Sequence, residues 1–280
     1  MPSKDIPMSQ SLPLYQIDAF TDRVFGGNPA AVCPLNVWLT DEVMQAIALE
    51  NNLSETAYFV ARDDGDFDIR WFTPLAKIDL AGHPTLATAW LILNRLEPSR
   101  QTVRFHSMTG DVLDIARDGD LLVMDFPARP ASPIAVPDGF AEAIGLAPQE
   151  LLRAVKNMAV FGSAEEVLGL DPDMSFIKGL EGFGLICTAP GDDYVDECDF
   201  VSRFFAPHVG IPEDPVTGSA HCTLIPYWAS RLCKDKLHAR QVSARGVSYS
   251  AKMLARVSPS PGGRCSIWKA GSTFDGPPQR

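Results

Sequence analysis

A single carboxylate, Glu55, stands in the stretch NNLSETAYF (51–59), between small polar residues and a segment that alternates like a β-strand. Such a glutamate can be a solvated loop acid, or it can be held in place to move a proton. Gly82 and Gly218 suggest a second chemistry, because each begins an apolar segment that predicts a buried helix. The first N–H groups of a helix are unpaired donors, and glycine lets a carboxylate or an oxyanion approach them closely.

The two glycines occupy equivalent places in an internal repeat. Residues 70–96 align with residues 203–232, and the matching pairs are Arg70 and Arg203, Phe72 and Phe205, Pro74 and Pro207, Asp79 and Asp214, Gly82 and Gly218, and Leu96 and Leu232. Each copy predicts a strand, a loop with an aspartate and a glycine that opens a helix, so we expect two similar domains related by a pseudo-twofold axis. The alternative is that both glycines merely serve tight turns. A cleft between two helix starts is favoured by the polar residues beside them, which are His83, Asp214, Ser219 and His221.

The elements that must position these residues follow from hydrophobic patterning. Short alternating segments predict strands at 14–20, 56–61, 67–73, 101–106, 111–116 and 120–126. Residues 40–52 predict a helix with Thr40 as its N-cap, and residues 82–96 predict a helix that is apolar nearly all round and therefore buried. A proline-rich stretch after Phe126 is the best linker candidate. We therefore predict domains at 1–127 and 128–280.

The composition predicts a soluble globular protein and argues against several classes of function. The chain has 280 residues, 46% of them hydrophobic, but no apolar run long enough for a membrane span and no apolar signal-peptide core, so we expect a cytoplasmic protein without a membrane partner. Its net charge of −11, without a basic stripe, argues against a nucleic-acid partner. Six cysteines are scattered without ligand or disulfide spacing, so we expect no metal site.

Four segments occur in an order and spacing that resemble one known family: IDAFTDRVFGGNPAAVCPL, NNLSETAYF, RWFTPLAKIDLAGHPTLATA and EDPVTGSAH. They are similar to the phenazine-biosynthesis PhzF family of isomerases, which share the diaminopimelate-epimerase fold, and the resemblance covers about residues 14–246. It implies an α+β fold with two pseudo-symmetric domains, each a β-barrel-like sheet around a central helix. It also implies an active site in the cleft between the domains.

The resemblance implies a cofactor-independent isomerase that shifts a proton or a double bond in a small carboxylate-bearing metabolite. Glu55 would take a proton from a carbon next to an unsaturated system and return it at another carbon, while helix-start amides and Ser219 hold a carboxylate or oxyanion. The residues carried over are Glu55, His83 and Asp214 as catalytic, and Asn28, Ser54, Gly82, Gly218 and Ser219 as substrate-binding. A homodimer is a reasonable assembly. The alternative is a catalytically silent ligand-binding or protein-interaction member of the same fold.

Two positions separate this chain from racemases of the diaminopimelate-epimerase type, in which two cysteines stand just before the helix-start glycines. Ala81 and Thr217 occupy these positions here. Neither can act as a thiolate base, so the resemblance implies a single-glutamate isomerase and not a two-cysteine racemase. Cys222, a turn into the second helix, is predicted to be a core residue.

The tail after about Gly246 departs from the family's ending, which closes with alternating strands similar to GRAVLYLEG. A proline and glycine cluster falls where a closing strand should run, and proline cannot donate to a central ladder: Pro259, Pro261, Gly262 and Gly263. We therefore predict an irregular tail with little β-structure beyond Arg264–Trp268. Synonymous codons for residues 261–273, read one nucleotide earlier, spell a family-like strand, which leads to the hypothesis of a frameshift near Gly246.

Overall fold

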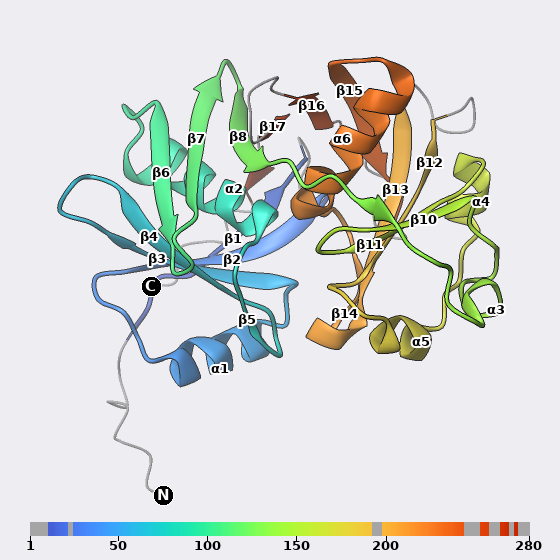
Figure 1. Cartoon of the computed structure of the whole chain (residues 1–280). Coiled ribbons are helices and arrows are strands. Elements are labelled where there is room, and N and C mark those ends of the chain that lie inside the picture. The colour runs from blue at the N-terminus through green and yellow to red at the C-terminus, as the bar shows by residue number, and fades with distance from the viewer. Residues whose placement is uncertain are drawn as a thin grey trace, which may run out of the picture.

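The computed structural model of the chain describes residues 11–21, 25–191 and 198–243, together with the backbone of three short tail strands at 253–257, 264–268 and 272–273. Two halves lie side by side, and in each of them a helix packs against a curved sheet (Figure 1). Among the described residues, no helix is both long enough and apolar enough to span a membrane.

The N-terminal half is a sheet curved around α2 (Gly82–Leu91), which continues as a π-helical turn, η1 (Ile92–Leu96). The strands pair in the order β1–β2–β3–β4–β6–β7–β8, in which β2/β3 and β4/β6 are parallel, and β5 pairs with β4. Their bounds are β1 (Tyr15–Ala19), β2 (Asn28–Leu35), β3 (Glu55–Ala61), β4 (Phe67–Phe72), β5 (Lys77–Ile78), β6 (Thr102–Ser107), β7 (Val112–Asp118) and β8 (Leu121–Pro127).

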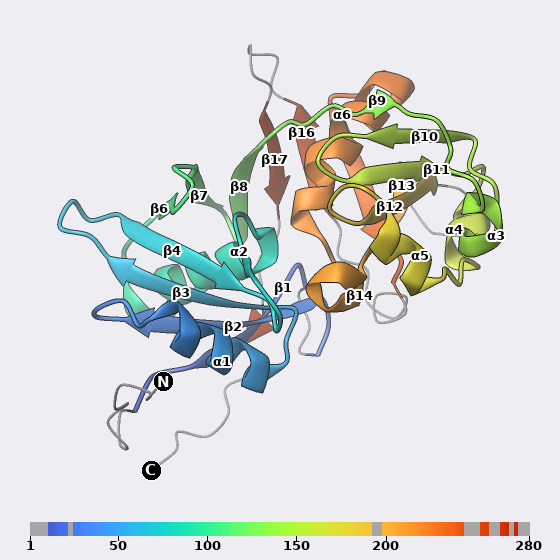
Figure 2. The ribbon, with the colours of Figure 1, turned by 60° about the horizontal axis from the view of Figure 1, so that its bottom comes forward.

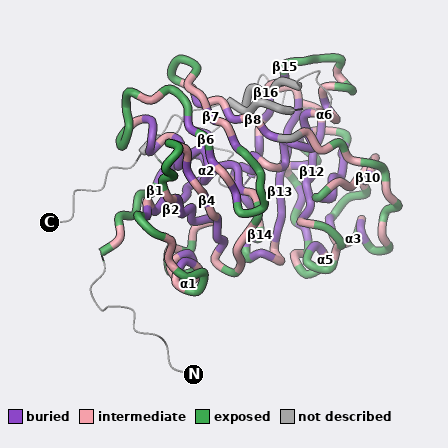
Figure 3. Tube along the Cα trace, turned by 60° about the vertical axis from the view of Figure 1, so that its left-hand side comes forward, coloured by how far each residue is buried: buried purple, intermediate pink, exposed green. Residues whose placement is uncertain are grey.

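Alternation within β3 explains how this sheet is buried on both faces. Ala57 and Phe59 belong to the large core that includes α2, whereas Tyr58 packs on the opposite face with Met44 of α1 (Asp41–Asn51). The Tyr58 hydroxyl also donates a 2.7 Å hydrogen bond to the Met44 carbonyl oxygen. The strands that hold the site are therefore fixed from both sides, and exposed residues gather mainly in the connections (Figure 3).

The C-terminal half repeats the central topology of the N-terminal half. Its parallel pairs β11/β12 and β13/β15 correspond to β2/β3 and β4/β6, and α6 takes the place of α2. Its strands are β9 (Ser132–Pro133), β10 (Glu150–Arg153), β11 (Asn157–Val160), β12 (Leu185–Pro190), β13 (Phe200–Ala206), β14 (Ile211–Asp214) and β15 (Lys236–Gln241). Its helices are α3 (Phe140–Ile144), α4 (Ala164–Leu168), α5 (Met174–Gly179), η2 (Pro207–Val209), η3 (Gly218–Ala220) and α6 (His221–Leu232).

This architecture confirms the predicted α+β fold with two pseudo-symmetric domains, and the six strands and two helices expected in the first half are present. Three details differ. Thr40 is the N-cap of α1 but its side chain makes no capping hydrogen bond. Gly218 opens a 3-10 turn before α6 begins at His221. The linker stretch contributes β9, which pairs with β10 of the second half, and the boundary after residue 127 stays a prediction.

The prediction of little β-structure beyond Arg264–Trp268 is wrong. The backbone of β16 (Met253–Val257) pairs with β15, β17 (Arg264–Trp268) pairs with both β16 and β8, and β18 (Ser272–Thr273) pairs with β1. Ladder bonds are made by the main chain, so the proline cluster is compatible with a sheet when it falls between two strands. The cluster itself and the tail's side chains lie outside the described residues. The frameshift hypothesis stays a prediction, which sequencing of the coding DNA tests.

Candidate active site

The starts of the two pseudo-equivalent helices meet where the two halves join. Gly82 is the first residue of α2, and a Cβ atom added to it would lie 3.3 Å from the Cα atom of Gly218 and 3.0 Å from the Phe126 ring. A Cβ atom on Gly218 would lie 3.5 Å from the Cα atom of Gly82 and 3.2 Å from the Phe20 ring. A side chain at Gly82 would therefore crowd the Gly218 backbone, whereas a side chain at Gly218 would crowd the Phe20 ring and meet the Gly82 backbone at an ordinary contact distance.

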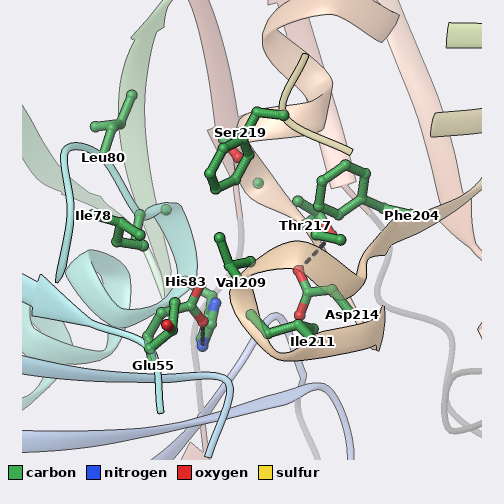
Figure 4. Close-up of a pocket in the computed structure, with 16 residues that line it drawn as sticks. Glu55, Ile78, Leu80, His83, Phe204, Val209, Ile211, Asp214, Thr217 and Ser219 are labelled. Carbon is green, nitrogen blue, oxygen red and sulfur yellow. Dashed lines mark hydrogen bonds and ion pairs between the residues drawn. The ribbon is translucent and has the colours of Figure 1, made fainter. Parts of the chain in front are cut away.

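A pocket that is partly open to solvent lies beside this junction (Figure 4). Six of the eight predicted site residues line it: Glu55, Gly82, His83, Asp214, Gly218 and Ser219. Much of the remaining wall is apolar and includes Ile78, Leu80, Phe183, Phe204, Val209 and Ile211. The N-terminal half contributes Glu55 and His83 and the C-terminal half contributes Asp214, so both halves line the pocket. In Figure 2, β14, which ends at Asp214, lies at the side of the C-terminal half that faces the N-terminal half.

The remaining two predicted residues lie elsewhere. Asn28, at the start of β2, is fully buried and does not line the pocket. Its Nδ2 atom donates to Asp214 Oδ1 at 2.7 Å and to the Val216 carbonyl oxygen at 2.9 Å, and it lies 3.2 Å from His83 Nδ1. Ser54 lies in the bend before β3 and lines a different depression, together with Asn52 and Leu53. Asn28 thus ties the two halves together, whereas Ser54 does not reach the pocket.

Glu55 and His83 lie side by side in a setting that disfavours charge. Glu55 as a whole residue is 8% exposed, and burial first and the negative charge of Asp214 second raise its pKa well above the ordinary 4.5. His83 Nε2 lies 3.3 Å from Glu55 Oε2. Burial lowers the pKa of His83 to about 3, so its imidazole is neutral and the contact is no salt bridge. A carboxyl group that titrates closer to neutral pH is suited to both accept and donate a proton.

Asp214 is held by a short hydrogen-bonded loop. The hydroxyl group of Thr217 donates to Asp214 Oδ2, and the Thr217 backbone N–H donates to Gln241 Oε1 at 2.7 Å. Gln241 Nε2 in turn donates to the backbone oxygen of Asp214 at 2.6 Å. Burial raises the pKa of Asp214 to about 6, against the opposing effect of the hydrogen bonds from Thr217 and Asn28. Two buried carboxyl groups with raised pKa values therefore face the same pocket.

Sequence reasoning missed two buried residues near the pocket. Gln241 lies in β15 and clamps the Asp214 loop, and Lys156 lies between β10 and β11 with its ammonium group near two aromatic rings of the pocket wall. Neither belongs to a motif, so the linear sequence carries no signal for their positions.

Ala81 and Thr217 flank the two glycines and both line the pocket, while Cys222 is a core residue of α6. Within the part of the chain that the structure describes, no group of three or more His, Cys, Asp or Glu residues could hold a metal ion.

The chain has a two-domain α+β fold like that of the epimerases, with its candidate site between the domains. A hydroxyproline epimerase of Agrobacterium vitis shares this fold at a TM-score of 0.61, with 12% identity over 94% of this chain and 91% of that one. A PhzF family protein of Enterococcus faecalis is much closer, with a TM-score of 0.85 and 40% identity over 95% of this chain and 98% of that one.

Sequence comparison agrees with the structural likeness. The profile of the family described as "Phenazine biosynthesis-like protein" matches residues 17–261. An uncharacterized isomerase of Pseudomonas aeruginosa is 50% identical over 84% of this chain and 88% of its own length. A phenazine biosynthesis-like domain-containing protein of Homo sapiens is 36% identical over 91% of this chain and 94% of its own length. The chain belongs to the phenazine biosynthesis-like (PhzF) family, and this membership supports an isomerase of the PhzF type that acts on a small molecule.

Proposed function

We propose that this protein is a cofactor-independent isomerase that moves a proton, and with it a double bond, within a small carboxylate-bearing metabolite. The observation that carries the proposal is a buried Glu55 with a raised pKa, in a pocket that also contains the starts of two facing helices. Family membership supports the isomerase class.

The proton transfer is assigned to Glu55. Its carboxylate takes a proton from a carbon next to an unsaturated system, and the electron pair of the broken C–H bond passes into that system. The same group, now a carboxylic acid, returns the proton to a different carbon, so the substrate and product are isomers. The neutral imidazole of His83 lies against this carboxyl group, with Nε2 3.3 Å from Glu55 Oε2, and completes the buried wall beside the proton carrier.

The helix starts are assigned to substrate binding. The backbone N–H groups of His83 and Ser219, which directly follow the two glycines, precede the first helical hydrogen bonds and lie at the positive ends of the helix dipoles. Together with the hydroxyl group of Ser219, they can bind the substrate carboxylate or stabilise negative charge that develops during the reaction. Ala81 and Thr217 exclude a pair of thiolate bases, so one glutamate serves both transfer steps.

Solvent deuterium tests this function. We expect NMR in deuterium oxide, applied to a panel of small cyclic and amino-acid-like carboxylates, to show deuterium entering at least one compound. Glu55→Gln keeps the shape of the side chain and removes the proton carrier, so it should abolish exchange while the same compound still binds. Binding without exchange in the unmodified protein would instead identify a catalytically silent ligand-binding protein.

A further inference from the structure

Lys156 is a buried cation that the proton-transfer scheme does not use. It is 6% exposed, and its Nζ atom lies 5.6 Å from the ring centroids of both Phe183 and Phe204. Both rings line the pocket, and Phe204 lies beside Thr217 in the wall from the C-terminal half (Figure 4). Among the described residues, no carboxylate lies within ion-pair distance of this ammonium group.

A second positive charge lies nearby. The backbone N–H of Arg129 donates to the Cys222 carbonyl oxygen at 2.7 Å, and Arg129 is half-buried. Its charge lies close enough to oppose protonation of Lys156, whose pKa falls to about 8, mainly through burial. The guanidinium group of Arg129 has no ion-pair partner among the described residues. Two neighbouring cations, neither of them in an ion pair among the described residues, are notable in a chain of net charge −11.

This arrangement is unfavourable for the folded protein. A buried ammonium group loses much of its hydration, and its cation–π contacts recover only part of that loss. Glu55 and Asp214 act on Lys156 through their charges but do not pair with it directly. Lys156 and Arg129 do not line the pocket themselves, but the two rings that contact the Lys156 ammonium group do, so an acid group of a ligand at this wall would add a negative charge close to Lys156.

We propose that Lys156 and Arg129 form a cationic subsite that binds a second acid group of the substrate, so that the preferred substrate is a small dicarboxylate. One carboxylate lies at the two helix starts, and the other lies at the Phe183–Phe204 wall. This inference rests on the proposed function, since it assigns the substrate class of the same pocket. Lys156 is a specificity residue in this scheme and takes no part in the proton transfer.

Paired ligands test the subsite directly. Isothermal titration calorimetry compares benzoate with isophthalate and terephthalate, and butyrate with glutarate. We expect a dicarboxylate of each set to bind about tenfold or more tightly than its monocarboxylate. Lys156→Met should remove this preference and leave monocarboxylate binding within about twofold of the unmodified protein. Lys156→Arg retains the charge and should retain the preference.

Two controls separate the subsite from other effects. Lys178→Met removes an exposed lysine of the same half and should leave the preference unchanged. Glu55→Gln should also leave it unchanged, because the subsite does not include the proton carrier. Equal binding of mono- and dicarboxylates by the unmodified protein, including no binding of either, would overturn the inference. So would a preference that persists in a folded Lys156→Met protein. A dicarboxylate preference in an unmodified protein that exchanges deuterium into none of the compounds would instead count against the proposed isomerase and leave the subsite in place.

Discussion

The titration of Glu55 should be visible in the pH dependence of turnover. Glu55 must be ionised to accept a proton, and burial and the charge of Asp214 both raise its pKa. We therefore expect kcat/KM to rise with pH through an apparent pKa well above 4.5. Asp214→Asn removes the charge but keeps an oxygen that can accept from Asn28, so it should move this acid limb to lower pH.

The pH–rate profiles of the unmodified protein and the Asp214→Asn variant provide the measurement. A Glu213→Gln variant is a control, because Glu213 is ion-paired with Arg203 and does not line the pocket. An acid limb that stays in place after Asp214→Asn would show that burial alone sets the pKa of Glu55.

The positive charge of the buried Lys156 side chain should lower the free energy of unfolding of the protein without a bound substrate. Its folded-state pKa is about 8 against an ordinary 10.5, so the folded protein binds fewer protons than the unfolded chain between these values. The free energy of unfolding therefore rises with pH across this window, and the full destabilisation is present below about pH 8. Lys156→Met should stabilise the protein at pH 7 by roughly 2–3 kcal/mol.

Thermal unfolding between pH 7 and pH 10.5 measures this effect, since the difference between the two proteins should shrink as the pH rises. Lys178→Met, at an exposed position, should change the stability little at any of these pH values. A Lys156→Met protein that is less stable at pH 7 would mean that contacts of the side chain outweigh the cost of its charge.

At the scale of elements, the contact between the starts of α2 and η3 determines whether the pocket can form. Gly82→Ala would place a methyl group 3.3 Å from the Gly218 backbone and 3.0 Å from the Phe126 ring. The backbone cannot give way as a flexible side chain would, so we expect a loss of about 1–3 kcal/mol of stability. Turnover should fall as well, because both helix starts would move.

Chemical denaturation of matched glycine variants tests this prediction. Gly179→Ala is the control, because a Cβ atom there meets nothing within 4 Å and α5 lies apart from the pocket. Its stability should stay within about 0.5 kcal/mol of the unmodified protein. A Gly82→Ala protein as stable and active as Gly179→Ala would show that the two helix starts do not need to be this close.

At the scale of the whole molecule, the tail strands join the two halves. β16 pairs with β15 of the second half and β17 pairs with β8 of the first half, so a continuous backbone ladder crosses from one half to the other. A chain that ends at Ser243 loses both strands and leaves β8 and β15 with unpaired edges. We expect it to unfold at lower temperature and to associate.

Size-exclusion chromatography and thermal unfolding compare this shortened chain with one that lacks only residues 274–280. The second chain retains every described tail strand and should resemble the full-length protein. If the chain that ends at Ser243 is monomeric and equally stable, the two halves do not depend on the tail ladder.

The sequence by itself determined the elements whose side chains repeat with a regular period. The alternation of β3, the apolar surface of α2 and the duplicated unit around Gly82 and Gly218 are local patterns, so they predicted the strands, the buried helix and the two-domain fold. The motif containing Glu55 and the one containing His83 likewise pointed to residues that line one pocket. β2 was missed, because a strand buried on both faces shows no alternation and this one contains two prolines.

Only the tertiary structure decided how these elements meet. Lys156 enters the surroundings of the pocket from the connection between β10 and β11, and Gln241 reaches the Asp214 loop across 27 residues of sequence. Neither position follows from spacing along the chain, because both depend on how distant strands pair. The raised pKa of Glu55 also depends on the closed interior, since burial and the charge of Asp214 act through space. Sequence patterns record which face of an element is buried, whereas the site arises from contacts between elements that are far apart in the chain.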